Sequence, residues 1–378
     1  MTEAADLPEP DRAEGAPHPR ETRVLFGQGA AEAAFLDAVN AGRPHHAWLL
    51  TGPRGVGKAT LAWRIARFML SRDDPGESAG PGLFGEAPPP PDTLDIDPGH
   101  PVARQVTALS APGLFLLRRG PNEKGERLSE EILVAEVRRL AEFLHLSATE
   151  GGRRVVIVDC ADEMTRSAAN ALLKMLEEPP PRVTFLLVSH RPARLLPTIR
   201  SRCRELRLPA LEARHMAAAL EQAGIEPPAD AAALAELAGG SVGAAVRLVT
   251  LDGLDLYAEL VTILSRLPEI DRARAVKLAD SVSARGAGER LELLFSLTDT
   301  LLARLARTGA TGAPPAAEAA PGEAGILARL APDPRRARTW AACAQEIGAR
   351  ARRGRAVNLD PAALVIDTVG RIRQAAAG

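Results

Sequence analysis

One stretch, residues 47–70 (AWLLTGPRGVGKATLAWRIARFML), limits the folds open to this chain more than any other. It begins with a short apolar run that suits a buried strand, and it ends with a segment that places its large apolar residues on one helical face. Between the two, residues 52–59 (GPRGVGKA) match the phosphate-binding pattern G-x-x-x-x-G-K-[ST] at every fixed position except the last. A strand, a glycine loop and a helix in this order predict an α/β domain.

The loop has the residues that phosphate binding needs. Gly52, Gly55 and Gly57 allow backbone N–H groups to turn toward a phosphate, and the start of the helix adds partial positive charge. Lys58 is placed to reach the β- and γ-phosphates. A glycine-rich turn before a helix, without a ligand, is the alternative interpretation.

The departure from the pattern concerns the metal. The last position of the motif supplies a hydroxyl to Mg²⁺, and here it is Ala59. Thr60 follows, but one residue along a helix turns a side chain by about 100°. We therefore expect phosphate binding with weakened metal binding.

A second candidate site follows the apolar run in residues 153–164 (RRVVIVDCADEM). Asp159 stands at the carboxyl end of this predicted strand, where ligands of open parallel sheets bind and where P-loop enzymes place a Mg²⁺-binding Asp. A helix-capping or turn carboxylate is the alternative. Another apolar run, 183–190, ends at His190, which is either a sensor of the terminal phosphate or a plain strand end.

Composition excludes several classes of protein. The formal net charge is −1, so the overall field of the chain does not favour DNA binding. The three cysteines form no CxxC pair, which argues against a zinc site or a disulfide framework. No apolar run has transmembrane length, and no secretory leader is visible. We expect a soluble cytoplasmic protein with no membrane partner.

Changes in composition along the chain predict its domains. Asp360 followed by Pro361 predicts the start of the last helix. The predicted domains are a disordered tail (1–22), a P-loop domain (23–209) with a Pro/Gly-rich surface insertion (71–112), a helical lid (210–253) and a helical domain (254–378).

Three runs resemble the clamp-loader subunits of bacterial DNA polymerase III, which are AAA+ proteins. They are HHAWLLTGPRGVGKAT, SAANALLKMLEEPPPRVTFLLVSHRPARLLPTIRSRC and GGSVGAAVRL, and the resemblance covers about residues 23–250. It implies a RecA-like parallel sheet with a helical lid, followed by an all-α collar for oligomerisation. It also implies a place in a DNA-directed DNA polymerase (nucleotidyltransferase) holoenzyme, with gamma/tau and delta subunits as partners and the sliding clamp and primed DNA reached through the complex.

Within that family the pattern resembles the delta-prime type, which acts as a stator and does not hydrolyse ATP. Motor subunits carry a catalytic Glu after the Walker B Asp, and this chain has Cys160 there, in addition to Ala59. The resemblance implies no intrinsic ATPase activity, an ATP site that is weak or vestigial, and Mg²⁺ only if ATP binds. It assigns Arg202 of the SRC motif as an arginine finger offered to a neighbouring subunit, and Arg247 as the sensor-2 residue of the lid.

The chain departs from the family pattern at one further place, and three alternative interpretations of its residues stay open. Family members usually carry a four-cysteine zinc module between the two nucleotide motifs, and this chain has no cysteine there, so we predict no zinc. From charge alone, the arginines around Arg202 are more often a solvated face than a functional site. A gamma/tau-type motor, with Thr60 or water replacing the lost hydroxyl and Glu163 as base, is the first functional alternative. A small-molecule P-loop kinase is the second, and the SRC motif and helical tail argue against it.

Overall fold

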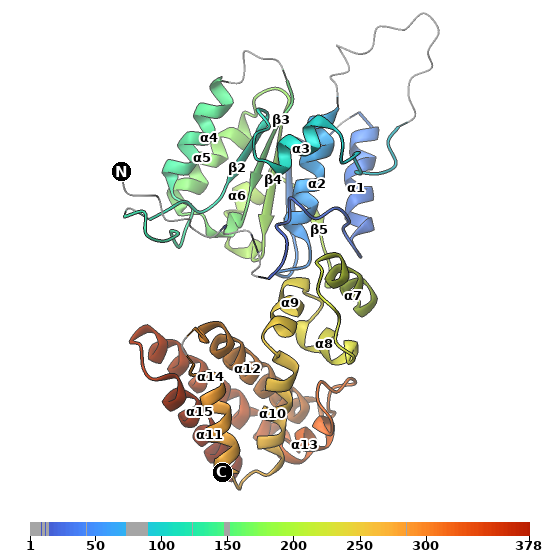
Figure 1. The fold of residues 1–378 in the computed structure, drawn as a ribbon. Coiled ribbons are helices and arrows are strands. Elements are labelled where there is room, and N and C mark those ends of the chain that lie inside the picture. The colour runs from blue at the N-terminus through green and yellow to red at the C-terminus, as the bar shows by residue number, and fades with distance from the viewer. Residues whose placement is uncertain are drawn as a thin grey trace, which may run out of the picture. The chain divides into compact units, whose positions relative to one another are not determined.

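The structure is a computed structural model that describes residues 9, 12, 15–42, 44–72, 90–122, 124–146, 152–284 and 286–378. The chain divides into two compact units. One unit comprises Met1–Leu211 and Ser241–Gly243, and the other comprises Glu212–Gly240 and Ala244–Gly378. The first unit contains a parallel sheet flanked by helices, and the second is helical throughout its described part (Figure 1). The predicted class, an α/β domain with a parallel sheet followed by an all-α part, is confirmed for the described residues.

The sheet has five strands in the order β2-β3-β4-β1-β5, and every pair in it is parallel. All residues of β1, β3 and β4 are buried, as expected when helices cover both faces of a parallel sheet. The strands are β1 (Ala47–Thr51), β2 (Leu114–Leu117), β3 (Arg154–Val158), β4 (Val183–Ser189) and β5 (Arg204–Arg207).

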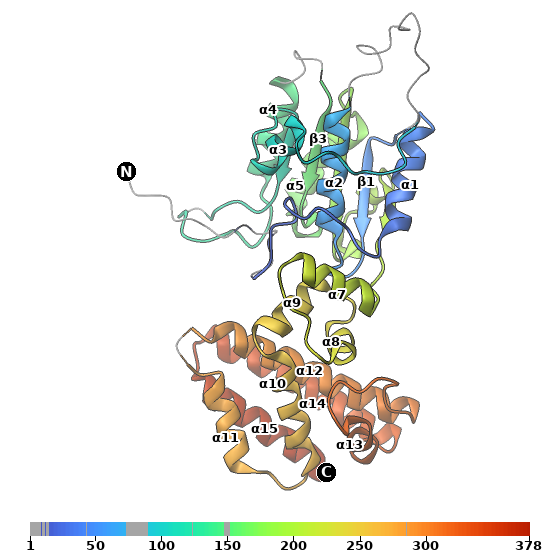
Figure 2. The same cartoon turned by 45° about the vertical axis from the view of Figure 1, so that its right-hand side comes forward.

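Each face of the sheet has its own core. Alternate strand residues point to opposite faces, so Trp48 and Leu50 of β1 join one core while Ala47 and Leu49 join the other. The first core is completed by α1 (Gly29–Asn40), α2 (Lys58–Ser71) and α3 (Pro101–Thr107), and the second by α4 (Val134–Leu146), α5 (Arg166–Glu177) and α6 (Pro197–Arg200). Figures 1 and 2 show these two helical layers on either side of the strands.

Nine helices form the described part of the second unit. Helix α12 packs along α14, while α15 packs on α11 and α14. Asp360 caps α15 by accepting from the Ala363 N–H, and Pro361 is its first residue, as predicted. The helices are α7 (Ala213–Gln222), α8 (Ala231–Ala238), α9 (Val242–Thr250), α10 (Gly253–Ser265), α11 (Arg272–Ser281), α12 (Gly288–Thr311), α13 (Glu323–Leu330), α14 (Pro334–Ala356) and α15 (Pro361–Ala377).

A buried ionic cluster ties four of these helices together. The Arg304 guanidinium on α12 donates to both carboxylate oxygens of Glu323 on α13, at 2.7 and 3.1 Å, and to Glu236 on α8 at 2.5 Å. The Tyr257 hydroxyl on α10 also donates to Glu323, at 2.6 Å. Glu323 and Tyr257 are fully buried, so this cluster fixes the lid helix α8 to α10, α12 and α13.

The prediction of a surface insertion at 71–112 is wrong for residues 90–112. Leu94 and Val106 are 2% and 0% exposed and belong to the core around α2. Helix α3 packs on α2, with Pro101 in its first turn, where a missing N–H costs nothing. Apolar residues between the prolines therefore return this part to the core. Residues 73–89 lie outside the described residues.

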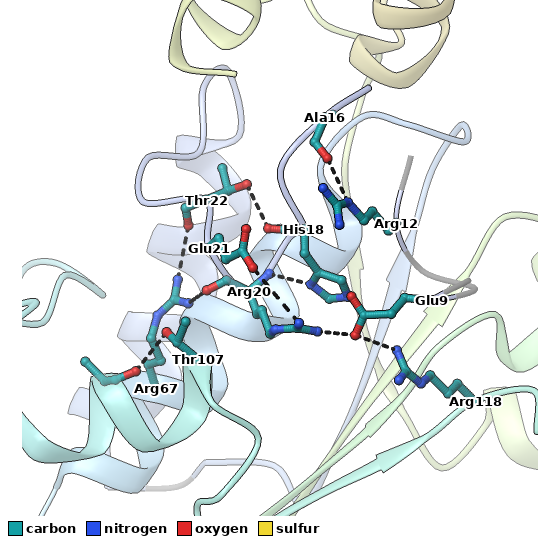
Figure 3. Close-up of polar contacts among 11 residues, drawn as sticks. Glu9, Arg12, Ala16, His18, Arg20, Glu21, Thr22, Arg67, Thr107 and Arg118 are labelled. Atoms are coloured by element: carbon teal, nitrogen blue, oxygen red, sulfur yellow. Dashed lines mark hydrogen bonds and ion pairs between the residues drawn. The ribbon is translucent and has the colours of Figure 1, made fainter. Parts of the chain in front are cut away.

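The prediction of a disordered tail at 1–22 is wrong for residues 15–22. We call these residues the N-terminal segment. His18 is completely buried with its ring edge against Trp63 of α2, at a centroid distance of 5.8 Å. Arg20 pairs with Glu9 at 2.5 Å, and Arg67 of α2 donates to the Arg20 carbonyl at 2.7 Å (Figure 3). Polar contacts with α2, rather than large apolar residues, hold this segment on the sheet unit.

Candidate functional site

The glycine loop between β1 and α2 has a backbone that only glycine fits easily. Gly52, Gly55 and Gly57 have φ values of 143°, 78° and 99°. A Cβ at Gly52 would lie 2.2 Å from the Leu208 carbonyl oxygen, and one at Gly55 would lie 2.2 Å from Ser241 Oγ. Other parts of the backbone lie so close to the loop that a side chain at Gly52 or Gly55 would clash with them. The loop itself has the glycine-rich backbone that can bind a phosphate through its N–H groups.

Lys58 begins α2 and is almost fully buried, at 2% exposure. Its ammonium group donates to the carbonyls of Gly52, at 2.7 Å, and Pro53. Burial lowers the pKa of Lys58 to about 8, although the carboxylates of Asp159 and Asp162 act in the opposite direction. The lysine is therefore held beside the loop and beside the acidic end of β3.

Asp159 and Cys160 follow the last residue of β3, as predicted. Cys160 has φ 52°, the left-handed region, and this conformation aims its thiol at the end of β4. Its Sγ lies 3.3 Å from His190 Nε2 and donates to Asp159 Oδ2 at 3.5 Å. Burial and the neighbouring carboxylates raise the pKa of Cys160 well above its usual range, while burial and Lys58 lower the pKa of His190 to about 4.

Asp162 is a site residue that sequence reasoning missed. It lies in the 3₁₀ helix Ala161–Glu163, past the end of β3, and a position there predicts a side chain that points away from the site. Instead its carboxylate accepts a hydrogen bond from the backbone N–H of His190 at 2.9 Å. Burial opposes ionisation of Asp162, but this hydrogen bond keeps its pKa below the ordinary value. The signal available in the sequence was its position four residues after the end of a buried strand.

Glu163 is turned to a different partner. Its carboxylate lies 3.2 Å from Nε of Arg119, just beyond β2.

Thr60 is buried in the first turn of α2, one position past Ala59. Among the described residues, no group of three or more His, Cys, Asp or Glu side chains is arranged to hold a metal ion. The residues present fit a nucleotide phosphate better than they fit its Mg²⁺, since Asp159 is the one predicted metal ligand at this edge of the sheet.

Arg202 lies at the opposite end of the sheet from the glycine loop. It precedes β5, whose Arg204 is paired with Trp48 at the start of β1, whereas the loop follows Thr51 at the end of β1. Between Arg202 and Leu208, which lies against Gly52, runs the four-residue strand β5, which spans about 13 Å. The side chain is partly exposed, and its guanidinium binds Glu177 at 2.8 Å and the Thr198 carbonyl at 3.0 Å.

Arg247 belongs to the helical unit, on α9. Its guanidinium lies 4.0 Å from Glu292 of α12, and both side chains are about two-fifths exposed. Glu292 also binds Arg355 of α14. The structure thus brings together the glycines, Lys58, Asp159 and His190 at the carboxyl edge of the sheet.

Comparison with protein families matches residues 96–212 to the family described as DNA polymerase III, delta subunit. The DNA polymerase III subunit delta' of Pseudomonas aeruginosa is 37% identical over 204 residues, which are 54% of this chain and 55% of that protein. The subunit of the same name from Yersinia pestis is 33% identical over 264 residues, 68% of this chain and 70% of that protein.

Gamma/tau subunits of DNA polymerase III are also similar to this chain. DNA polymerase III subunit gamma/tau of Mycobacterium bovis is 31% identical over 211 residues, 55% of this chain and 32% of that protein. Among solved structures, a gamma subunit-related protein of DNA polymerase III from Thermotoga maritima is similar over 90% of this chain and 99% of that chain, at 16% identity and a TM-score of 0.40. None of the described helices is long and apolar enough to cross a membrane.

Proposed function

This chain belongs to the delta-prime subunit family of DNA polymerase III, and we propose that it is a stator of the clamp loader that does not hydrolyse ATP itself. The proposed partners are the gamma/tau and delta subunits, and through them the sliding clamp and primed DNA. The proposed place of action is the cytoplasm, during DNA replication. In this assembly the chain lends Arg202 to ATP held by a neighbouring gamma/tau subunit.

The observation that carries the proposal is that Cys160, and not a carboxylate, directly follows Asp159 at the end of β3. Water attack on a phosphoryl group needs a residue that positions the water or accepts its proton. Cys160 occupies that position, and its raised pKa keeps it a neutral thiol in contact with His190. Glu163, the alternative base, is held by Arg119 at 3.2 Å. With Ala59 in place of the Mg²⁺-binding hydroxyl, two separate parts needed for hydrolysis are missing.

The position of Arg202 supports action in trans. The residue is partly exposed and precedes β5, at the opposite end of the sheet from the chain's own glycine loop. A guanidinium there can contact a nucleotide only if another molecule presents it. When ATP is bound on that neighbour, hydrolysis concentrates charge on the transferring phosphoryl group, and a planar, permanently charged Arg stabilises it. Glu177 and the Thr198 carbonyl hold the side chain in one position before a partner binds.

Steady-state ATP hydrolysis tests the proposal. The isolated chain should show no turnover, and the complex with gamma/tau and delta should be active. Arg202→Ala should lower turnover at the site that it completes by about 10³-fold or more. Arg200→Ala, an exposed arginine two residues away, is the matched control and should leave the rate unchanged.

A motor subunit of the gamma/tau type is the alternative that this assay separates. Turnover by the isolated chain that disappears in Lys58→Ala would identify a motor and overturn the stator proposal. Size-exclusion chromatography of each variant complex establishes that a lost rate is not a lost subunit.

A further inference from the structure

The last two helices concentrate positive charge. Residues 334–378 contain nine arginines, no lysine and three carboxylates, although the whole chain carries a formal net charge of −1. The basic residues are therefore segregated into α14 and α15 rather than spread evenly. Such segregation is the electrostatic pattern of a surface that meets a polyanion.

Four of these arginines share one exposed face of α14. At 100° per residue, Arg335, Arg338, Arg352 and Arg353 fall within about 100° of one another around the helix axis. All four are exposed, while the opposite side of the helix, including Trp340 and Ile347, is buried. From Arg335 to Arg353 the face is about 27 Å long. We call these four residues the α14 arginine stripe.

The stripe is not neutralised from within the described part of the chain. The nearby carboxylates are engaged by other arginines: Glu346 by Arg371, and Asp367 by Arg350 at 2.8 Å and by Arg371 at 3.1 Å. Glu292 of α12 binds Arg355. The four stripe arginines form no ion pair with another described residue, which leaves their guanidinium groups available to an external anion.

Most exposed residues in the middle of the stripe are small or uncharged, and the one carboxylate there, Glu346, is paired with Arg371. The exposed positions between the two arginine pairs include Ala342, Gln345 and Ala349. A packed protein interface needs large apolar or aromatic anchors, and this face of α14 presents none. Binding of single-stranded nucleic acid usually needs exposed aromatic side chains for stacking, which the face also lacks. Small residues flanked by arginines instead allow a regular phosphate backbone to lie along the helix, with the guanidinium forks on its oxygens.

We propose that the α14 arginine stripe binds the phosphate backbone of duplex DNA without reading its sequence. A 27 Å length of duplex presents about 16 phosphate charges, ample for four arginines. This goes beyond the stator function, which requires no contact between this chain and DNA. The two can fail separately, because one is measured as ATP turnover of a complex and the other as DNA binding by the chain alone.

The experiment is fluorescence anisotropy of a labelled duplex of about 30 base pairs titrated with the full chain from about 50 to 200 mM salt. The native chain should bind at the lowest salt with a micromolar dissociation constant typical of non-specific contacts. The variant with all four stripe arginines changed to alanine should bind at least tenfold more weakly. Its slope of log K against log salt should be smaller by about 3 to 4, since each phosphate contact contributes about 0.9.

A matched variant controls for net charge. It removes four exposed cations of the same unit that lie off the stripe: Arg214→Ala, Arg266→Ala, Arg272→Ala and Lys277→Ala. Circular dichroism should report native helicity for both variants, because alanine is favourable at exposed helical positions. Equal losses in the two variants would overturn the proposal, as would native binding by the stripe variant.

A second probe separates DNA from an acidic protein partner. Labelled polyglutamate is titrated under the same conditions with the same variants. If the stripe variant loses polyglutamate binding but keeps its affinity for the duplex, the surface recognises an acidic polypeptide and the DNA proposal is wrong. Loss of duplex binding with a weaker effect on polyglutamate supports the proposal.

Discussion

Gly52 is the residue at which the shape of the phosphate loop can be tested without any ligand. Its φ is 143°, and an added Cβ would lie 2.2 Å from the Leu208 carbonyl oxygen, so Gly52→Ala forces the backbone to shift. We expect it to lower the free energy of unfolding by about 2 kcal/mol or more, measured by urea denaturation. Gly42→Ala is the control, because Gly42 also has a positive φ, 69°, but open space around it, and it should cost about 1 kcal/mol. An equal loss of unfolding free energy in the two variants would contradict a close contact between Gly52 and the Leu208 carbonyl.

The thiol of Cys160 gives a second test at the residue scale. Burial and the Asp159 carboxylate raise its pKa in the folded chain, so the reactive thiolate is scarce near neutral pH. In a Cys203→Ser, Cys343→Ser background, we expect iodoacetamide at about pH 8 to alkylate the folded chain about 100-fold or more slowly than the chain in guanidinium. The native rate should still be rising at about pH 10. A native rate equal to the unfolded rate would mean that Cys160 is an activated thiol.

Among the helices, the buried cluster around Arg304 is the strongest candidate for a large stability effect. Arg304→Ala would leave the fully buried Glu323 carboxylate without its ion partner. We expect a loss of about 3–5 kcal/mol in the free energy of unfolding, followed by circular dichroism in urea. Arg350→Ala removes an exposed pair with Asp367 and should cost less than about 1 kcal/mol. If Arg304→Ala cost no more than Arg350→Ala, the cluster would not hold α8 to α12.

Elements defined by local pattern could be predicted from the sequence, and elements defined by distant partners could not. The apolar runs of β1, β3 and β4 and the loop residues Gly52 to Lys58 carry their own signals, and the start of α15 follows from Asp360 and Pro361. The N-terminal segment is different, because His18 is buried by Trp63, which lies far along the chain. Asp162 and His190 meet only because β3 and β4 are neighbours in the sheet. Single-sequence patterns do not contain such pairings.

For the whole molecule, added nucleotide should act through the phosphate loop and not through a metal. We expect about 1 mM ADP to raise the thermal midpoint of the full chain by only about 1–3 °C, as weak binding to the folded state implies. The shift should be the same in Mg²⁺ and in EDTA, because Ala59 offers the metal no oxygen, and Lys58→Ala should remove it. Ala59→Thr restores the missing hydroxyl and should make the shift larger in Mg²⁺ than in EDTA. A shift that requires Mg²⁺ in the native chain would show that the metal site survives without that hydroxyl, and it would remove half of the argument for a subunit that cannot hydrolyse ATP.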